Sequence, residues 1–123
     1  MPVFTEGRHA AAFVISEGNG NRSRDTVTVA SGQGELAAGA VLGKITASGK
    51  YALTTVAAVD GSETAVAVLL AAVDATSADV SAAVIARDAE VNGNLLSYGA
   101  DVDQAAEIAA KNAALAGVGI IVR

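Results

Sequence analysis

The chain of 123 residues contains no cysteine and no tryptophan, and aromatic residues make up 3% of it. Without cysteine there is no disulfide framework and no thiolate metal site. Because apolar residues still account for 52% of the sequence, the core must be built from Ala, Val, Leu and Ile, which bury little area per side chain. A single copy is therefore modestly stabilised, and burial against further copies or against another protein would add stability.

Basic residues are also few, with 8 Lys and Arg against 13 Asp and Glu. Nucleic-acid binding needs clustered basic side chains that displace counterions. The basic residues here are scattered along the chain, so we expect no direct nucleic-acid partner.

Long apolar runs are missing too. The longest, residues 65–73, is about half the length of a membrane span, and the N-terminus lacks the pattern of a secretory signal. We therefore expect no membrane partner. The length of the chain favours one domain.

Short segments rich in Val, Ile and Thr recur along the chain, separated by turn residues such as Gly, Asp and Ser. This spacing is typical of a mainly β domain. Asp60-Gly61 is a signal for a two-residue hairpin. The predicted strands lie in 26–30, 40–46, 50–58, 64–73, 79–87 and 118–123.

Residues 101–117 have a helical period of Ala, Ile and Leu. Asp101 or Asp103 could act as the N-cap, and Asp101 with Gln104 has the spacing of a capping box. Glu107 and Lys111 are placed for an i,i+4 ion pair, and Gly117 suits the position just past the end of the helix. We predict one short helix near the C-terminus, with an alanine-rich face able to pack on a partner.

The stretch "GAVLGKIT" (39–46) resembles a phosphate-binding loop. It has three residues between its glycines where four are needed, and Ile45 stands where the metal-binding hydroxyl belongs. No helix is predicted after it. We interpret Gly43 instead as a glycine inside a strand, which marks a bulge or a close backbone approach.

No set of residues is suited to catalysis or to binding a metal or cofactor. His9 is the single histidine, so a metal site or triad based on histidine would lack partners. Asp101 and Asp103 lack the later glycine and glutamate of a calcium loop. The charged segment 87–90 is better explained as a solvated strand end or an ion pair between subunits. These observations indicate a structural or binding protein without enzymatic activity.

Several blocks of the sequence, taken in their order along the chain, resemble the lambda-D-like head decoration proteins of tailed bacteriophages. The resemblance runs from about Glu6 to Arg123, and the series is more specific than any single block. The blocks are "EGRHAAAFVISEGNGNRSRDTVTVASGQGELAAGAVLGKITASGKY", "AAVDAT", "IARDAEVN" and "GIIVR".

The resemblance implies a mainly β, β-clip-like bent ribbon that assembles as a homotrimer. Such trimers bind the major capsid protein on the outer surface of the expanded head, at local threefold positions, and stabilise it. The protein would be made in the cytoplasm of the host bacterium and end in the virion.

The resemblance also implies an N-terminal arm, residues 1–15, that lies against the capsid protein, followed by one β-rich domain, residues 16–123. We expect the trimer contact near the helix (103–115) or the last strand (118–122). The predicted capsid-contact residues are Pro2, Val3, Phe4, Thr5, Glu6, Gly7, Arg8, His9 and Phe13.

An alternative is a small β-ribbon binding module without catalysis, for carbohydrate or as a tail accessory domain, because glycine-rich β folds host many functions. A sugar site normally requires aromatic side chains that stack on the ligand. With two Tyr and two Phe in the chain, this alternative is less well supported.

Overall fold

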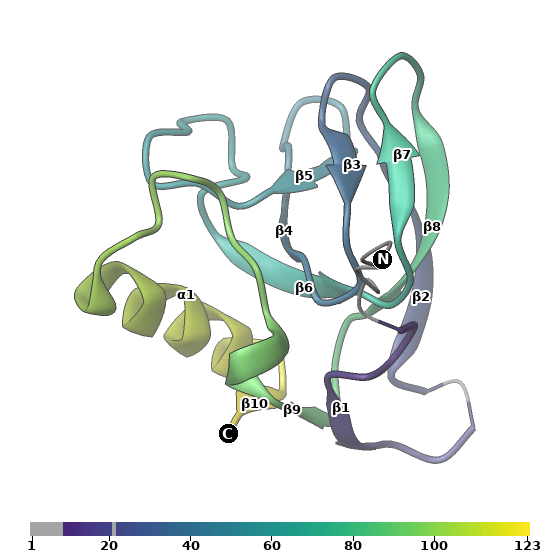
Figure 1. Ribbon diagram of the computed structural model, residues 1–123, viewed down its shortest axis with the longest axis vertical. Coiled ribbons are helices and arrows are strands. Elements are labelled where there is room, and N and C mark those ends of the chain that lie inside the picture. Colours follow the sequence, from purple (N-terminus) through teal and green to yellow (C-terminus); the bar gives the residue numbers. More distant parts are fainter. Residues whose placement is uncertain (1–8, 21) are drawn as a thin grey trace, which may run out of the picture.

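The computed structural model describes residues 9–20 and 22–123. The protein is mainly β with one α-helix near the C-terminus (Figure 1), as the sequence predicts. The β-clip assignment stays a prediction. The elements are β1 (Val14–Glu17), β2 (Arg24–Val29), β3 (Gly34–Leu36), β4 (Val41–Lys44), β5 (Tyr51–Leu53), β6 (Ala65–Leu69), β7 (Val73–Ala75), β8 (Val80–Ile85), β9 (Ala89–Val91), a 3-10 turn (Gly93–Leu95), α1 (Ala105–Gly117) and β10 (Ile120–Val122).

Five strands close into a small barrel in the order β2-β5-β4-β6-β8. β2 pairs antiparallel with β8 along its whole length, and β4 lies between β5 and β6. A parallel contact between Val29 and Tyr51 joins β2 to β5 and completes the ring. Closure pairs each of these strands on both sides, which removes edges that could aggregate.

A second, three-stranded sheet lies at one end of the barrel and has the order β1-β9-β10. β1 is antiparallel to β9, whereas β10 is parallel to it. The first and last strands of the chain therefore flank the same central strand (Figure 1). α1 packs against β10 and β6 and bridges this sheet to the barrel. β3 and β7 form a separate two-stranded ribbon.

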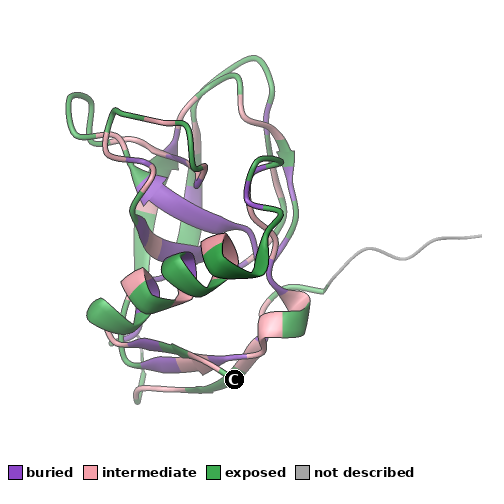
Figure 2. Cartoon of the chain, turned by 90° about the vertical axis from the view of Figure 1, so that its left-hand side faces the viewer, coloured by how far each residue is buried: buried purple, intermediate pink, exposed green. Residues whose placement is uncertain are grey.

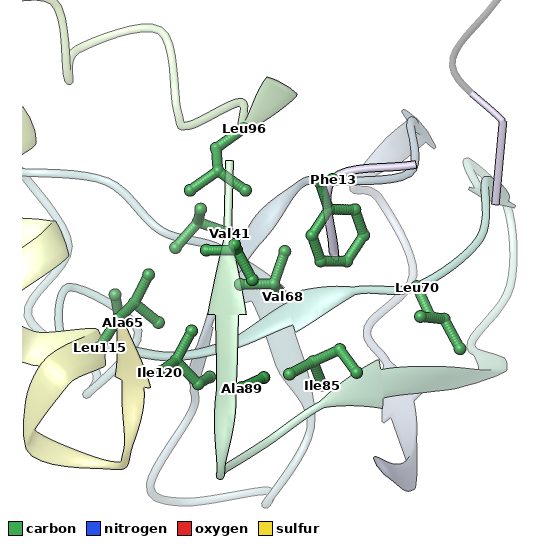
Figure 3. Packing of buried hydrophobic residues seen from close by; sticks show 11 residues of the cluster. Phe13, Val41, Ala65, Val68, Leu70, Ile85, Ala89, Leu96, Leu115 and Ile120 are labelled. Atoms are coloured by element: carbon green, nitrogen blue, oxygen red, sulfur yellow. The ribbon is translucent and has the colours of Figure 1, made fainter. Parts of the chain in front are cut away.

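The buried side chains form two clusters. One fills the barrel and comes from residues between Val29 and Val84. The other lies where the barrel, the three-stranded sheet and α1 meet, and it extends from Phe13 to Ile120 (Figure 3). As composition predicted, both clusters consist of aliphatic side chains apart from Phe13.

Gly43 behaves as the sequence predicts. The register between β4 and β6 shifts between Leu42 and Gly43, and a Cβ built at Gly43 would lie 2.0 Å from the carbonyl oxygen of Ser62. Both a bulge and a close approach are present. Gly39 has φ 93°, and a Cβ there would meet the Leu95 carbonyl oxygen at 2.2 Å. Both glycines of the apparent phosphate loop are thus required by packing.

The predicted hairpin at Asp60-Gly61 is wrong. β5 and β6, which flank this turn, do not pair with each other, because both pair with β4. Gly61 does have positive φ, at 105°, so the local turn chemistry is present. The predicted strand 50–58 is confirmed over Tyr51–Leu53, and the segment 64–73 contains β6 and the first residue of β7.

The helix is confirmed, but its ends differ from the prediction. The N-cap is Gln104, whose backbone N–H donates to Glu107 Oε1 at 3.1 Å. Val118 follows the helix, and Gly119, with φ 89°, takes the left-handed position predicted for Gly117. Asp101 does not cap the helix, because its carboxylate accepts hydrogen bonds from a distant loop. Lys111, predicted to pair with Glu107, is buried, and its Nζ donates to the carbonyls of Thr55 and Glu63.

Candidate interaction surfaces

The predicted contact residues from Pro2 to Arg8 lie outside the described residues. The described chain begins at His9, which is exposed. The backbone N–H of Ala11 donates to the carbonyl of Leu70 at 2.8 Å, and the N–H of Val14 donates to the carbonyl of Ala11 at 3.0 Å. These bonds attach the N-terminal segment to the end of β6 just before β1 begins.

Phe13, one of the predicted capsid-contact residues, is a core residue of the chain. Its side chain is 1% exposed and lies in one cluster with Val41 and Val68 (Figure 3). Its carbonyl accepts a hydrogen bond from Asn92 N–H at 2.7 Å. Because a phenylalanine is by far the largest apolar side chain available in this sequence of small residues, it fills the space between the sheet and the barrel. Phe13 therefore packs with the folded body, while the division of the chain into an arm and a β-rich domain stays a prediction.

The outer face of the three-stranded sheet combines apolar and charged side chains. Ile15 is 55% exposed and Ile121 37% exposed. Between them, Glu90 accepts hydrogen bonds from Arg123 Nε at 2.8 Å and from Ser16 Oγ at 3.1 Å. These two bonds, that from Arg123 foremost, lower the pKa of Glu90.

The charged residues beside this sheet pair with one another. Arg24 donates from Nη2 and Nε to the two oxygens of Glu17, at 2.7 and 3.1 Å, and this lowers the pKa of Glu17. Within the segment 87–90, Arg87 pairs with Asp25 and Asp88 pairs with Arg22. Arg87 and Asp88 of that segment therefore form ion pairs within the chain, as expected of a solvated strand end.

Figure 2 shows that one side of α1 is exposed, and the exposed residues of the helix are alanines and Gly117. β10 pairs with β9 on one side, and within the described residues no strand pairs with its other edge. Val118, between α1 and β10, is 36% exposed. The exposed alanines are Ala105, Ala106, Ala109, Ala110, Ala113 and Ala116.

A shallow hollow of about 540 Å³ lies along the β3-β7 ribbon, against Leu36 and Val73. Within residues 9–20 and 22–123, no group of three or more His, Cys, Asp or Glu is arranged to hold a metal ion. No helix in the same part of the chain is long and apolar enough to cross a membrane.

Sequence reasoning missed the exposed apolar residues Ile15, Val56 and Val59. Val56 and Val59 belong to the apolar run Val56-Ala57-Ala58-Val59, which we had assigned in part to a strand. The signal that could have identified them is the Asp-Gly turn that follows directly, since it indicates that the run precedes a tight turn.

Comparison with protein families gives the decisive observation. The model of the family described as bacteriophage lambda head decoration protein D matches residues 3–120. The chain belongs to this family. The match starts within the predicted N-terminal arm, covers every element from β1 to α1 and ends at the first residue of β10. The comparison with curated proteins found no match.

Membership defines the general role of this head decoration protein. The family consists of structural proteins of the bacteriophage capsid, which gives the chain a capsid-decoration role and a location in the virion.

Proposed function

We propose that the protein binds as a homotrimer to the outer surface of the expanded phage head, at local threefold positions, and stabilises the shell. The observation that carries this proposal is the family match over residues 3–120. The major capsid protein is the proposed partner.

The proposed capsid-binding arm comprises Pro2 to His9, and Phe13 is left out because it is buried. The bond between Ala11 and Leu70 supports this division, since it marks the point where the arm joins the folded body. An extended arm can add a strand to an exposed sheet edge of the capsid protein. Ordering about eight residues costs on the order of 10 kcal/mol, so one arm binds weakly.

Three arms on one trimer compensate for this weakness. Once one arm is bound, the other two experience a high effective concentration, which can raise the overall affinity by about 100-fold or more. Only a surface that presents three matching sites at the right spacing engages all of them. The trimer would therefore select the symmetric sites of the expanded shell.

We place the contact between subunits on the alanine side of α1 and on β10. Small side chains allow close approach of backbones, and the open edge of β10 has hydrogen-bonding groups available for a neighbour. Val118 and Ile121, which are partly exposed at this end, would be covered by the contact.

The test compares the full chain with a variant that lacks residues 2–8. A deletion that reached Phe13 would remove a core side chain and confuse binding with folding. A matched control replaces residues 2–8 with a Gly/Ser segment of equal length. Cosedimentation with expanded heads measures binding, light scattering measures the oligomeric state, and thermal unfolding of the heads measures stabilisation.

We expect both variants to remain folded trimers and to lose binding to the heads. A variant without residues 2–8 that still decorates and stabilises heads would remove the arm from the mechanism. A full chain that is monomeric at capsid-saturating concentration would contradict the trimer.

A further inference from the structure

The loop of residues 55–63, between β5 and β6, presents an apolar tip to solvent. Val59 is 95% exposed and Val56 is 45% exposed. With Ala57 and Ala58 they form four consecutive apolar residues outside any helix or strand. An exposed run of this kind is unfavourable for a protein surface unless it serves a contact.

Lys111 of α1 attaches both ends of this loop to the helix. Its side chain is buried, at 6% exposure, and Nζ donates to the carbonyl of Thr55 at 2.7 Å and to the carbonyl of Glu63. Burying an ammonium group is costly unless its hydrogen bonds are made. The sequence therefore commits a buried charge to holding a segment that has no regular secondary structure.

Further hydrogen bonds hold the interior of the loop. The carboxylate of Asp101 accepts from the backbone N–H groups of Val56 and Ala57, both at 3.0 Å, and these bonds lower the pKa of Asp101. Thr46 N–H donates to the Asp60 carbonyl at 2.9 Å. The tip is thus held in one conformation, and a pre-ordered loop loses less conformational entropy on binding than a disordered one.

The charges around the tip indicate which kind of partner covers it. Asp60 and Glu63 lie in the loop and Asp101 lies against it, while the one cation bound to the loop, Lys111, is buried. Lys44 beside the loop is also exposed, but the acidic side chains outnumber it, so the exposed surroundings of the apolar tip are mainly negative. A complementary surface has an apolar pocket with Lys or Arg at its rim.

A second copy of this chain does not offer such a surface within its described residues. Lys44 remains outside the ion pairs, but it lies beside the same loop, since a Cβ on Gly61 would be 2.7 Å from the Lys44 carbonyl oxygen. Five other basic side chains, exposed or partly exposed, pair with carboxylates of the same chain; they are Arg22, Arg24, Lys50, Arg87 and Arg123.

We propose that the 55–63 loop is a second capsid contact, in which Val59 enters an apolar pocket with a basic rim on the capsid protein. This proposal rests on the proposed function and adds a contact independent of the N-terminal arm. The loop supplies a rigid apolar anchor, and Lys111 acts as a positioning residue for it.

The test measures binding of the full-length protein to expanded heads that lack decoration. Val59→Ser removes the apolar tip, and Ile15→Ser is the matched control because it removes an exposed apolar side chain from the three-stranded sheet. We expect Val59→Ser to weaken binding about tenfold or more, with an unchanged oligomeric state, and Ile15→Ser to have a smaller effect. Wild-type binding should weaken as sodium chloride is raised, because salt screens the charged rim.

Two further variants test the positioning role. Lys111→Met keeps the aliphatic stem but removes the hydrogen bonds to the loop, and Asp101→Asn is the second variant if Lys111→Met does not fold. Each should speed hydrogen exchange in residues 55–63 and weaken head binding although Val59 is intact. A purely structural role would instead change global stability without a selective change in this loop.

Several outcomes would overturn the proposal. The first is a Val59→Ser variant that binds heads as tightly as the wild-type protein. The second is a changed oligomeric state of Val59→Ser, which would assign the loop to a contact between copies. The third is wild-type binding that does not depend on salt. If the wild-type protein itself fails to bind heads, the proposed function fails as well. Intact wild-type binding with no effect of Val59→Ser rejects the loop contact alone.

Discussion

The two apolar clusters of this protein are assembled from different parts of the chain. The barrel cluster uses residues between Val29 and Val84, all within one continuous segment. The cluster under the three-stranded sheet needs Phe13 from one end of the chain and Leu115 and Ile120 from the other. Both clusters are thus mainly aliphatic, but the first is formed by one continuous segment and the second requires residues from both ends of the chain.

This difference predicts that the two clusters contribute unequally to the stability of the protein. Bringing distant segments together costs more loop-closure entropy than pairing near ones, and contacts between distant residues form slowly. We therefore expect the barrel to be the more protected unit, and the second cluster to open first when the chain ends are disturbed.

The largest expected effect comes from Phe13→Ala. It removes the one aromatic side chain among the buried residues of the second cluster and leaves a cavity, at a cost of about 3–5 kcal/mol in the free energy of unfolding. Phe13→Leu, the control, should lose much less because it keeps most of the volume. Urea denaturation measures both variants, and a near-neutral Phe13→Ala would contradict the core position of this residue.

Leu115→Ala and Leu69→Ala compare the two clusters with the same chemical change. Both side chains are fully buried, so each substitution should cost about 2–5 kcal/mol. We expect Leu115→Ala to speed hydrogen exchange in α1 and β10 while β2 and β8 remain protected. Leu69→Ala should speed exchange throughout. Identical exchange patterns would show that the two clusters unfold as one unit.

Gly43→Ala tests the tight packing of the barrel wall. Since the added Cβ would meet a backbone oxygen at 2.0 Å, the strand must shift, and we expect a loss of about 1–3 kcal/mol. Gly117→Ala is the matched control, because nothing lies within 4 Å of its Cβ position and alanine favours helix by up to about 1 kcal/mol. Thermal unfolding should move in opposite directions for the two variants.

The smallest effect concerns the ion pair of Glu17 and Arg24 beside the second cluster. The bond from Arg24 lowers the folded-state pKa of Glu17 below the ordinary value of 4.5. Its stabilising contribution is therefore complete above pH 4.5 and is lost as the pH falls through the folded-state pKa. Glu17→Gln should be slightly less stable than wild type at neutral pH, and the two melting temperatures should converge in acid. A gap that persists in acid would assign the effect to packing.

Local signals predicted some elements well. The alternation of apolar and polar residues in β2 and β8, and the helical period of α1, are short-range patterns, and the structure confirms the elements there. Gly43 was interpreted correctly because a glycine in a strand has few physical explanations.

The predictions whose outcome depends on residues far away in the sequence were less successful. Asp60-Gly61 is a genuine turn, but it joins strands that both pair with β4, and strand pairing is not encoded in the turn. Their spacing predicted that Asp101 caps the helix and that Lys111 forms an ion pair along it. In the structure both side chains form hydrogen bonds with the loop of residues 55–63 instead. The resemblance placed Phe13 in the N-terminal arm, but whether its side chain is buried depends on the distant residues that it contacts.

The sequence by itself determined the fold class, the aliphatic nature of the core and, through its series of blocks, membership of the head decoration family. Those properties follow from composition and from patterns within a few residues. Only the tertiary structure decided that the barrel closes, that the chain ends share one sheet, and that Lys111 holds a loop with an exposed apolar tip. Each of these depends on contacts between residues far apart in the chain, whose free energy no local pattern reports.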